Sequence, residues 1–276
     1  MLLPASYLNG FAPRDGQPLY PSLWTGCVGA WNPGLGPSGL TLRDNSGFGR
    51  HGTLTNGPTF AASQGRYAMN FDGVDDKVLC GNILGSVFQG DYTVVVTIKT
   101  SSTGLGRLIG KADYGSNLSP FSVLFNYPTA GKVRFYASTN NDAIALTSAA
   151  SDLNADQWKT LAFQQQSATQ SIYVNGMLNA SQTRSNNAAT NASQFTIGHD
   201  GSGDGLGTQQ FSGAIGEVRV YSIAVANSVH QILATRRGIA YEMAPRRRLS
   251  VQVTVAPLRY NLFSGSIGNT DVIGAS

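Results

Sequence analysis

The chain has 276 residues, of which 41% are hydrophobic and 12% charged, and its formal net charge is +4. The segment from Arg236 to the end holds six arginines and two acidic residues, so residues 1–235 are neutral overall. A neutral body with a basic end argues against a nucleic-acid-binding domain and favours docking on an acidic protein surface. The length suits one large domain with extensions better than two small domains.

Neither a membrane anchor nor a signal peptide is expected. No apolar run approaches the roughly 20 residues that cross a bilayer. The beginning, MLLPASYLNGFAPRDG, lacks a basic stretch followed by a sustained apolar one. We therefore expect synthesis in a cytoplasm without export and no insertion into membranes.

Residues 1–23 are expected to form an extended arm, because they contain four prolines and no periodic pattern. The leucines and aromatic residues of this arm indicate that it lies on a protein surface, its own or a neighbour's.

From residue 24 to about residue 200 the sequence predicts about a dozen short strands, separated by turns rich in Gly, Asn, Ser and Pro. Residues 91–100, DYTVVVTIKT, are the most strongly β-branched run, and we expect a strand buried on both faces. The dipeptide Asn175-Gly176 is typical of a two-residue type I′ hairpin turn.

Residues 211–237 predict a strand that leads into a short helix. In the strand, Glu217 and Arg219 lie on one face and form an expected ion pair. In the helix, Val229 and Leu233 belong to an apolar stripe, and His230 beside it is expected at the surface or at its boundary.

Residues 241–276 form a second predicted arm. It contains a triple arginine, Arg246, Arg247 and Arg248, and then an alternating run with Val251, Val253 and Val255. Such a strand can add to an exposed sheet edge of its own domain or of a partner. We favour docking between subunits, and an edge strand of the same domain with a frayed tail is the alternative.

Cys27 and Cys80, the two cysteines of the chain, each lie in a predicted strand. The missing signal peptide favours free buried thiols over a disulfide.

Several segments, taken in order, resemble the laminin-G-like, concanavalin A-like jelly-roll domains. They are GCVGAW, RDNSGFGRHGTLTNGPTF, NFDGVDDKVLCG, DYTVVVTIKT, GRLIGK, WKTLAF, IYVNGML and FSGAIGEVRVYSIAVANSVHQIL, which together span about residues 24–237. The resemblance implies an all-β, two-sheet antiparallel sandwich with one short C-terminal helix. We assign residues 24–240 to this domain, between the arms 1–23 and 241–276.

The sequence does not favour an enzyme. Glycoside hydrolysis requires two carboxylates across the scissile bond, which the glucanase branch of the family carries as an E-x-D-x-x-E run. The chain has only two glutamates, Glu217 and Glu242, and no such run. A G-x-S-x-G motif and a phosphate-binding glycine loop are also absent from the sequence.

Structural calcium is the cofactor that the sequence favours most, at either of two oxygen-rich loops. The first combines Asp44 with Asp72, Asp75 and Asp76, and Glu217 is a further candidate ligand, as the family resemblance implies. The second is the loop with Asp200 and Asp204, which matches the first half of a calcium-binding loop but has Phe211 where the glutamate at the twelfth position belongs.

Glycan binding would use aromatic platforms beside polar side chains. Arg134 and Tyr136 share a face of one predicted strand, and Tyr173 is a third candidate, with Tyr114 and Tyr127 also available. Packing at the sheet boundary is the alternative role for these tyrosines.

Together these features predict a non-enzymatic structural or binding module. Because the family resemblance extends to bacteriophage virion proteins, we expect a virion component, such as a capsid decoration or tail-associated protein, made in a host cytoplasm. Its partners would be other virion proteins and further copies of itself through the arms, and cell-surface glycans through the sandwich. A soluble carbohydrate-binding lectin is the alternative.

Overall fold

The structure is a computed structural model that describes residues 23–35, 39–63, 66–113, 118–138, 145–184, 188, 190–199 and 209–235. The chain divides into two units, residues 1–246 and residues 247–276, and all described residues belong to the first. The two predicted arms, apart from Leu23, lie outside the described residues.

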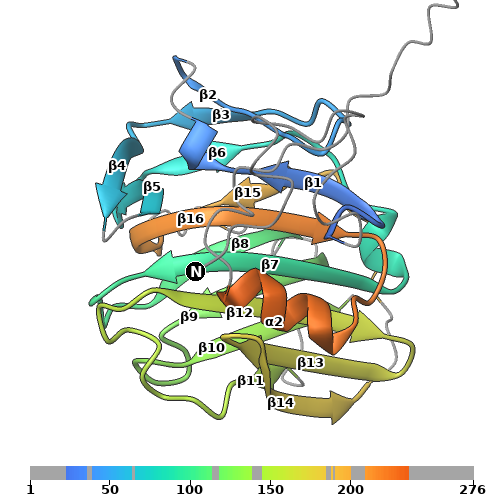
Figure 1. Cartoon of the computed structure of the whole chain (residues 1–276). Helices are drawn as coiled ribbons and strands as arrows, with labels where there is room; N and C mark the ends of the chain where they lie inside the picture. The colour runs from blue at the N-terminus through green and yellow to red at the C-terminus, as the bar shows by residue number, and fades with distance from the viewer. Residues whose placement is uncertain are drawn as a thin grey trace, which may run out of the picture. The chain divides into compact units, whose positions relative to one another are not determined.

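Two eight-stranded antiparallel sheets stack face to face, one behind the other in Figure 1. Sheet A has the strand order β14-β13-β12-β7-β16-β5-β4, and β1 also pairs with β16. Its strands are β1 (Cys27–Trp31), β4 (Thr59–Ser63), β5 (Arg66–Asp72), β7 (Tyr92–Lys99), β12 (Lys159–Gln166), β13 (Thr169–Val174), β14 (Met177–Thr183) and β16 (Ser212–Tyr221).

Sheet B has the strand order β11-β10-β9-β8-β15-β6-β3-β2. Its strands are β2 (Thr41–Leu42), β3 (Gly52–Thr55), β6 (Lys77–Leu79), β8 (Gly106–Asp113), β9 (Leu118–Phe125), β10 (Val133–Ser138), β11 (Leu146–Thr147) and β15 (Thr196–Ile197). The described helices are two short 3₁₀ turns, η2 (Pro33–Leu35) and η3 (Val87–Gln89), and the α-helix α2 (Asn227–Thr235). None of them has the length and hydrophobicity needed to cross a membrane. The predicted two-sheet sandwich with one short helix is confirmed.

Aromatic side chains fill the space between the sheets. Phe121 lies at the centre, with its ring centroid 4.9 Å from that of Phe88 and 5.7 Å from that of Phe135. Phe163, 5.6 Å from Phe135, extends the cluster into sheet A. Each of these four side chains is fully buried. Burying such large apolar groups is the main favourable contribution to folding.

Strand β7 is buried on both faces, as its β-branched sequence predicts. Tyr92, Val94 and Val96 face the core between the sheets, whereas Val95 belongs to a second apolar cluster on the outer face of sheet A. That second cluster includes Val229 and Leu233 of α2, which lies across the front sheet in Figure 1. Helix α2 therefore covers the outer face of sheet A.

The conformation of the turn between β13 and β14 suits a tight hairpin and also leaves room for helix α2. Asn175 and Gly176 have φ values of 50° and 80°, as the predicted type I′ turn requires. A Cβ atom on Gly176 would lie 2.8 Å from Cα of Gln231, so glycine also permits α2 to approach the turn closely.

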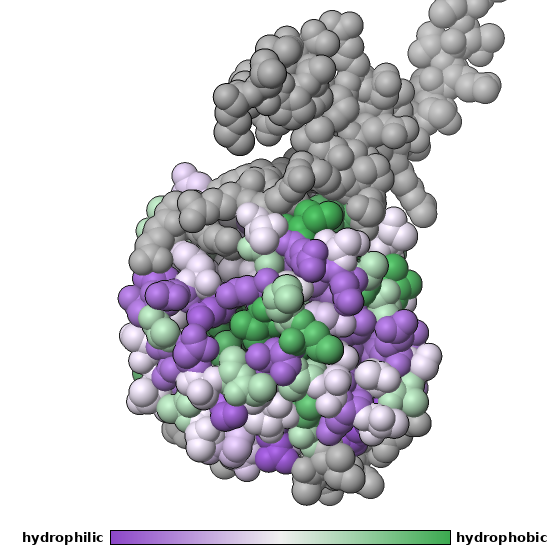
Figure 2. All heavy atoms as spheres, turned by 60° about the horizontal axis from the view of Figure 1, so that its bottom comes forward, coloured by the Kyte–Doolittle hydropathy of each residue, from purple (hydrophilic) through white to green (hydrophobic). Residues whose placement is uncertain are grey.

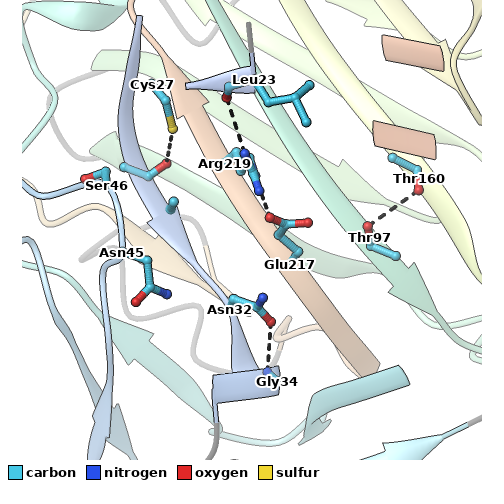
Figure 3. Close-up of polar contacts among 12 residues, drawn as sticks. Leu23, Cys27, Asn32, Gly34, Asn45, Ser46, Thr97, Thr160, Glu217 and Arg219 are labelled. Carbon is cyan, nitrogen blue, oxygen red and sulfur yellow. Dashed lines mark hydrogen bonds and ion pairs between the residues drawn. The ribbon is translucent and has the colours of Figure 1, made fainter. Parts of the chain in front are cut away.

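A buried arginine attaches the start of the described chain to the same outer face. Figure 3 shows Arg219 between the carbonyl group of Leu23 and the carboxylate of Glu217. The Arg219 guanidinium also lies 4.5 Å from the ring centroid of Trp24, and the Tyr221 hydroxyl donates a 3.0 Å hydrogen bond to the Leu23 carbonyl. Burial alone would lower the pKa of Arg219, but the charge of Glu217 and its other neighbours hold that pKa above its ordinary value.

The expected surface position of His230 is wrong, because this side chain is 2% exposed. His230 directly follows Val229 in α2, and adjacent positions share the broad face that a helix turns toward a sheet. The imidazole stacks on the ring of Tyr173 at a centroid distance of 3.9 Å, and its Nε2 lies 3.0 Å from Oε1 of Gln164. Its Nδ1 has no hydrogen-bond partner in the described part of the chain.

We predict that this burial makes the stability of the protein depend on pH. Burial lowers the pKa of His230 from 6.5 to about 4, so the unfolded chain binds an additional proton between these two values. The free energy of unfolding therefore falls as the pH falls, by about 2 kcal/mol from His230 alone between about pH 7 and about pH 5.

The variant His230→Gln removes the titrating group, and its free energy of unfolding in urea should lose that part of the pH dependence. Equal pH dependence in the wild type and the variant would contradict the prediction.

Candidate functional site

Three of the predicted metal ligands meet in the loop between β5 and β6. Asp72, Asp75 and Asp76 each offer a carboxylate oxygen, and these oxygens lie within 4.8 Å of one another. Main-chain hydrogen bonds shape the loop: Oδ1 of Asp72 accepts one from Val74 at 2.8 Å, and Oδ2 of Asp76 accepts one from Asp72 at 3.0 Å. Main-chain hydrogen bonds therefore help to hold the three carboxylates close together.

The electrostatics of the loop are those of crowded acidic groups. Burial raises the pKa of Asp76, and the charges of Asp72 and Asp75 add to that effect. Hydrogen bonds from backbone N–H groups, first that of Val74, lower the pKa of the exposed Asp72. A divalent cation would relieve the repulsion, and carboxylate and carbonyl oxygens are the donors that calcium prefers. The residues of the loop thus fit part of a calcium shell.

The other candidate ligands are placed differently. Asp44 is outside the set of three and accepts hydrogen bonds within its own surroundings, among them 2.9 Å bonds from the main-chain N–H groups of Ala30 and Arg50. Glu217 is paired with Arg219, the ion pair that the sequence predicts. Asp200 and Asp204 lie outside the described residues, as do Arg246, Arg247 and Arg248.

The outer face of sheet B carries a cation between aromatic rings. Arg134 of β10 lies 5.3 Å from the ring centroid of Tyr127 and 5.3 Å from that of Tyr136. Arg134 and Tyr127 are partly exposed, whereas Tyr136 is 8% exposed and lies beneath the surface. The partly exposed residues of this site are therefore Arg134 and Tyr127, the kind of polar and aromatic pair on which sugars bind.

A second arginine shares this face. Arg134 in β10 and Arg107 in β8 both pair with Leu124 of the intervening strand β9. Arg107 is 3% exposed, so little of its side chain is accessible on this face. Sequence reasoning did not select Arg107, because matching it to Arg134 requires the register of three strands that are adjacent only in the fold.

Tyr173 does not join this site. It lies in β13 of sheet A, where it stacks on His230 and its hydroxyl donates a 3.2 Å hydrogen bond to Oδ1 of Asn227 at the start of α2. The structure therefore brings Arg134 and Tyr136 together and places the third glycan candidate under the helix, on the opposite sheet.

Comparison with known structures finds related folds. The sialidase of Trypanosoma rangeli in complex with sialic acid superposes with a TM-score of 0.57 and 16% sequence identity, over 76% of this chain and 32% of the sialidase. The binding domain of botulinum neurotoxin DC in complex with SialylT gives a TM-score of 0.59 and 12% identity, over 77% of this chain and 52% of that domain. The binding domain of botulinum neurotoxin serotype D gives 0.59 and 13%, over 76% and 51%.

The chain thus spans about a third of the sialidase and about half of each toxin domain. At these identities the likeness shows a shared fold. A sequence search against curated proteins gives no match.

Residues 72–229, more than half of the chain, match the family described as the concanavalin A-like lectin/glucanases superfamily. This range contains both the acidic loop and the Arg134 face, and the two antiparallel sheets agree with it. The chain belongs to the concanavalin A-like lectin/glucanases superfamily.

Proposed function

We propose that the chain is a non-enzymatic binding module that contacts glycans through the outer face of sheet B around Arg134. The observation that carries this proposal is the partly exposed residue Arg134, whose guanidinium lies 5.3 Å from the ring centroid of Tyr127. An aromatic ring offers a flat apolar surface to the C–H face of a sugar, and a guanidinium donates several hydrogen bonds in fixed directions. The complexes of the similar structures with sialic acid and SialylT make sialylated glycans the first class to test.

A non-enzymatic role is supported by the state of the carboxylates. The chain has no E-x-D-x-x-E run, and Glu217, the one glutamate in the described part of the chain, is held by Arg219, which is 1% exposed. A general acid needs a proton that it can give to the leaving group. Glu217 is already paired with a buried arginine and therefore suits that role poorly.

We place this module in a virion, as a capsid decoration or tail-associated protein that assembles with other virion proteins and with further copies of itself through its two arms. Leu23 and α2, where the described chain begins and ends, both lie on the outer face of sheet A, opposite the Arg134 face. One side of the sandwich is therefore available for attachment and the other for binding. A soluble lectin is the alternative function.

We also propose that the loop with Asp72, Asp75 and Asp76 holds a structural calcium ion. Three carboxylate oxygens within 4.8 Å of one another support this assignment. The ion would join the end of β5 to the start of β6 and so connect the two sheets.

For the glycan site, we expect Arg134→Ala and Tyr127→Ala to weaken binding. For Arg134→Ala, the loss of a hydrogen bond from a charged group corresponds to roughly a tenfold to hundredfold loss of affinity. Lys77→Ala, on the outer face of the same sheet but in β6, is the matched control and should bind normally. The measurement is a screen of sialylated and neutral glycans followed by calorimetry. A screen without any binding by the wild type would refute the glycan proposal.

For the metal site, calcium should raise the thermal midpoint relative to a chelator. A concentration about 100 times the dissociation constant would stabilise the fold by about 2.7 kcal/mol. The variant Asp75→Asn should lose this response, whereas Asp91→Asn, which neutralises an exposed aspartate outside the loop, should retain it. An unchanged wild-type midpoint with and without chelator would exclude the calcium site.

For assembly, chains that lack residues 1–22 or 241–276 should fail to incorporate into particles, as measured by co-purification, while circular dichroism shows an unchanged sandwich. The reason is that neither deletion removes a described strand. Normal incorporation of both truncated chains would contradict the assembly role, and the lectin alternative would then be preferred.

A further inference from the structure

Within the described residues, strand β14 is an open sheet edge without protective charges. It forms one end of sheet A, and its seven residues, MLNASQT, include no charged residue and no proline. Its first two side chains are strongly exposed, Met177 at 64% and Leu178 at 56%. Figure 2 brings this side of the molecule forward and shows hydrophobic surface surrounded by polar residues. Natural proteins usually blunt such edges with lysine, proline or a covering segment.

Part of the edge is already occupied, and this limits where a further strand can pair. A bulge interrupts the pairing of β13 with β14 between Ile172 and Tyr173. Asn179 lies at this bulge, and its Oδ1 accepts hydrogen bonds from the main-chain N–H groups of Ala149 and Ala150 at 2.8 and 3.2 Å. The free edge therefore begins after Asn179.

Beyond the bulge the backbone directions follow from one hydrogen bond. The N–H of Arg184 donates to the carbonyl of Ala168, so the N–H of Arg184 points toward the β13 side. In an antiparallel pair successive residues point their N–H and C=O groups alternately toward and away from the partner strand. Ser181 and Thr183 therefore present both groups to the outside, where an added strand would pair.

The apolar surface beside this edge continues a covered cluster. Leu178 pairs with Tyr173, and Tyr173 is buried under α2 together with Val229 and Leu233. A strand that pairs with β14 after Asn179 would therefore lie next to this apolar surface.

The sequence after α2 contains a segment of matching character. The chain has 41 residues beyond Thr235, and α2 itself packs against β12 and β14. Residues 249–256, LSVQVTVA, alternate apolar and small or polar side chains over eight residues, without charge, and Pro257 ends the run. Such alternation favours a strand with one apolar face, and its length is close to that of β14.

We propose that residues 249–256 of a second copy of this chain pair with the free edge of β14 and extend sheet A. The exchange between copies rests on the proposed assembly through the arms, and it specifies where one arm docks. Main-chain hydrogen bonds to Ser181 and Thr183 provide the pairing.

Cysteine cross-linking in the full chain tests this arrangement. One population carries Ser181→Cys, and the other carries Val253→Cys or Thr254→Cys, so that both faces of the arm are sampled. Mixing them should give about tenfold more disulfide-linked dimer than mixing the same arm variants with Ala62→Cys, which lies on the opposite edge strand β4. The native Cys27 and Cys80 are buried and provide a low background.

Three outcomes would overturn the proposal. They are equal dimer yields at Ser181 and Ala62, no dimer at either position, and a link formed only within single chains of a double variant, which would show that each arm docks on its own sheet. Ser181→Lys should also block incorporation into particles, with Ala62→Lys as the control. If deletion of residues 241–276 prevents incorporation but Ser181→Lys does not, the assembly role holds and docking at β14 is wrong.

Discussion

The coverage of β7 on both faces is the constraint on which the rest of the structure depends. Its alternate residues face the aromatic core, and the residues between them, Thr93, Val95 and Thr97, are at most 5% exposed on the other side. A central β-branched strand that is left open to water would lose the burial of large apolar areas, at roughly 25 cal/mol per Å². The sandwich alone buries only one side of sheet A, so further segments must cover the other. Helix α2 covers part of that face, and the segment at Leu23 and Trp24 packs against the same cluster.

Helix α2 and the segment before it make polar as well as apolar contacts with sheet A, because the outer face of this sheet carries both kinds of side chain. The Thr93 hydroxyl lies 3.0 Å from Oε1 of Gln164 and accepts a hydrogen bond from the N–H of Val225 at 3.1 Å. Oε1 of Gln164 in turn contacts His230 of α2. Buried polar groups need partners in fixed positions, so this network sets the position of the helix more sharply than apolar contact alone. The low pKa of His230 follows from the same burial.

The two-sheet fold could be predicted from sequence because its signals are local. Alternation within strands, the Asn175-Gly176 turn and the Glu217–Arg219 pair each depend on residues close in the chain, and the structure contains all three. The buried, free thiols expected of Cys27 and Cys80 are also present.

The composition of the candidate site could not be predicted in the same way, because it depends on which strands become neighbours. Tyr173 and Arg134 appear equivalent in the sequence, yet β13 and β10 belong to different sheets. Arg107 and Arg134 are 27 positions apart but flank the same residue of β9. The burial of His230 could likewise not be predicted, because the width of the α2 face that contacts the sheet depends on the shape of the sheet beneath the helix.

The two faces of the sandwich have consequently become unequal. The outer face of sheet A is used internally, since covering β7 occupies it with α2 and with the first described residues. The described part of the chain therefore begins and ends on that side. On the outer face of sheet B, Arg134 is partly exposed, and its guanidinium lies near the rings of Tyr127 and Tyr136. If the proposed attachment uses the covered side, the arginine face points outward. The packing requirement that places the helix would then leave the outer face of sheet B for the proposed glycan contact.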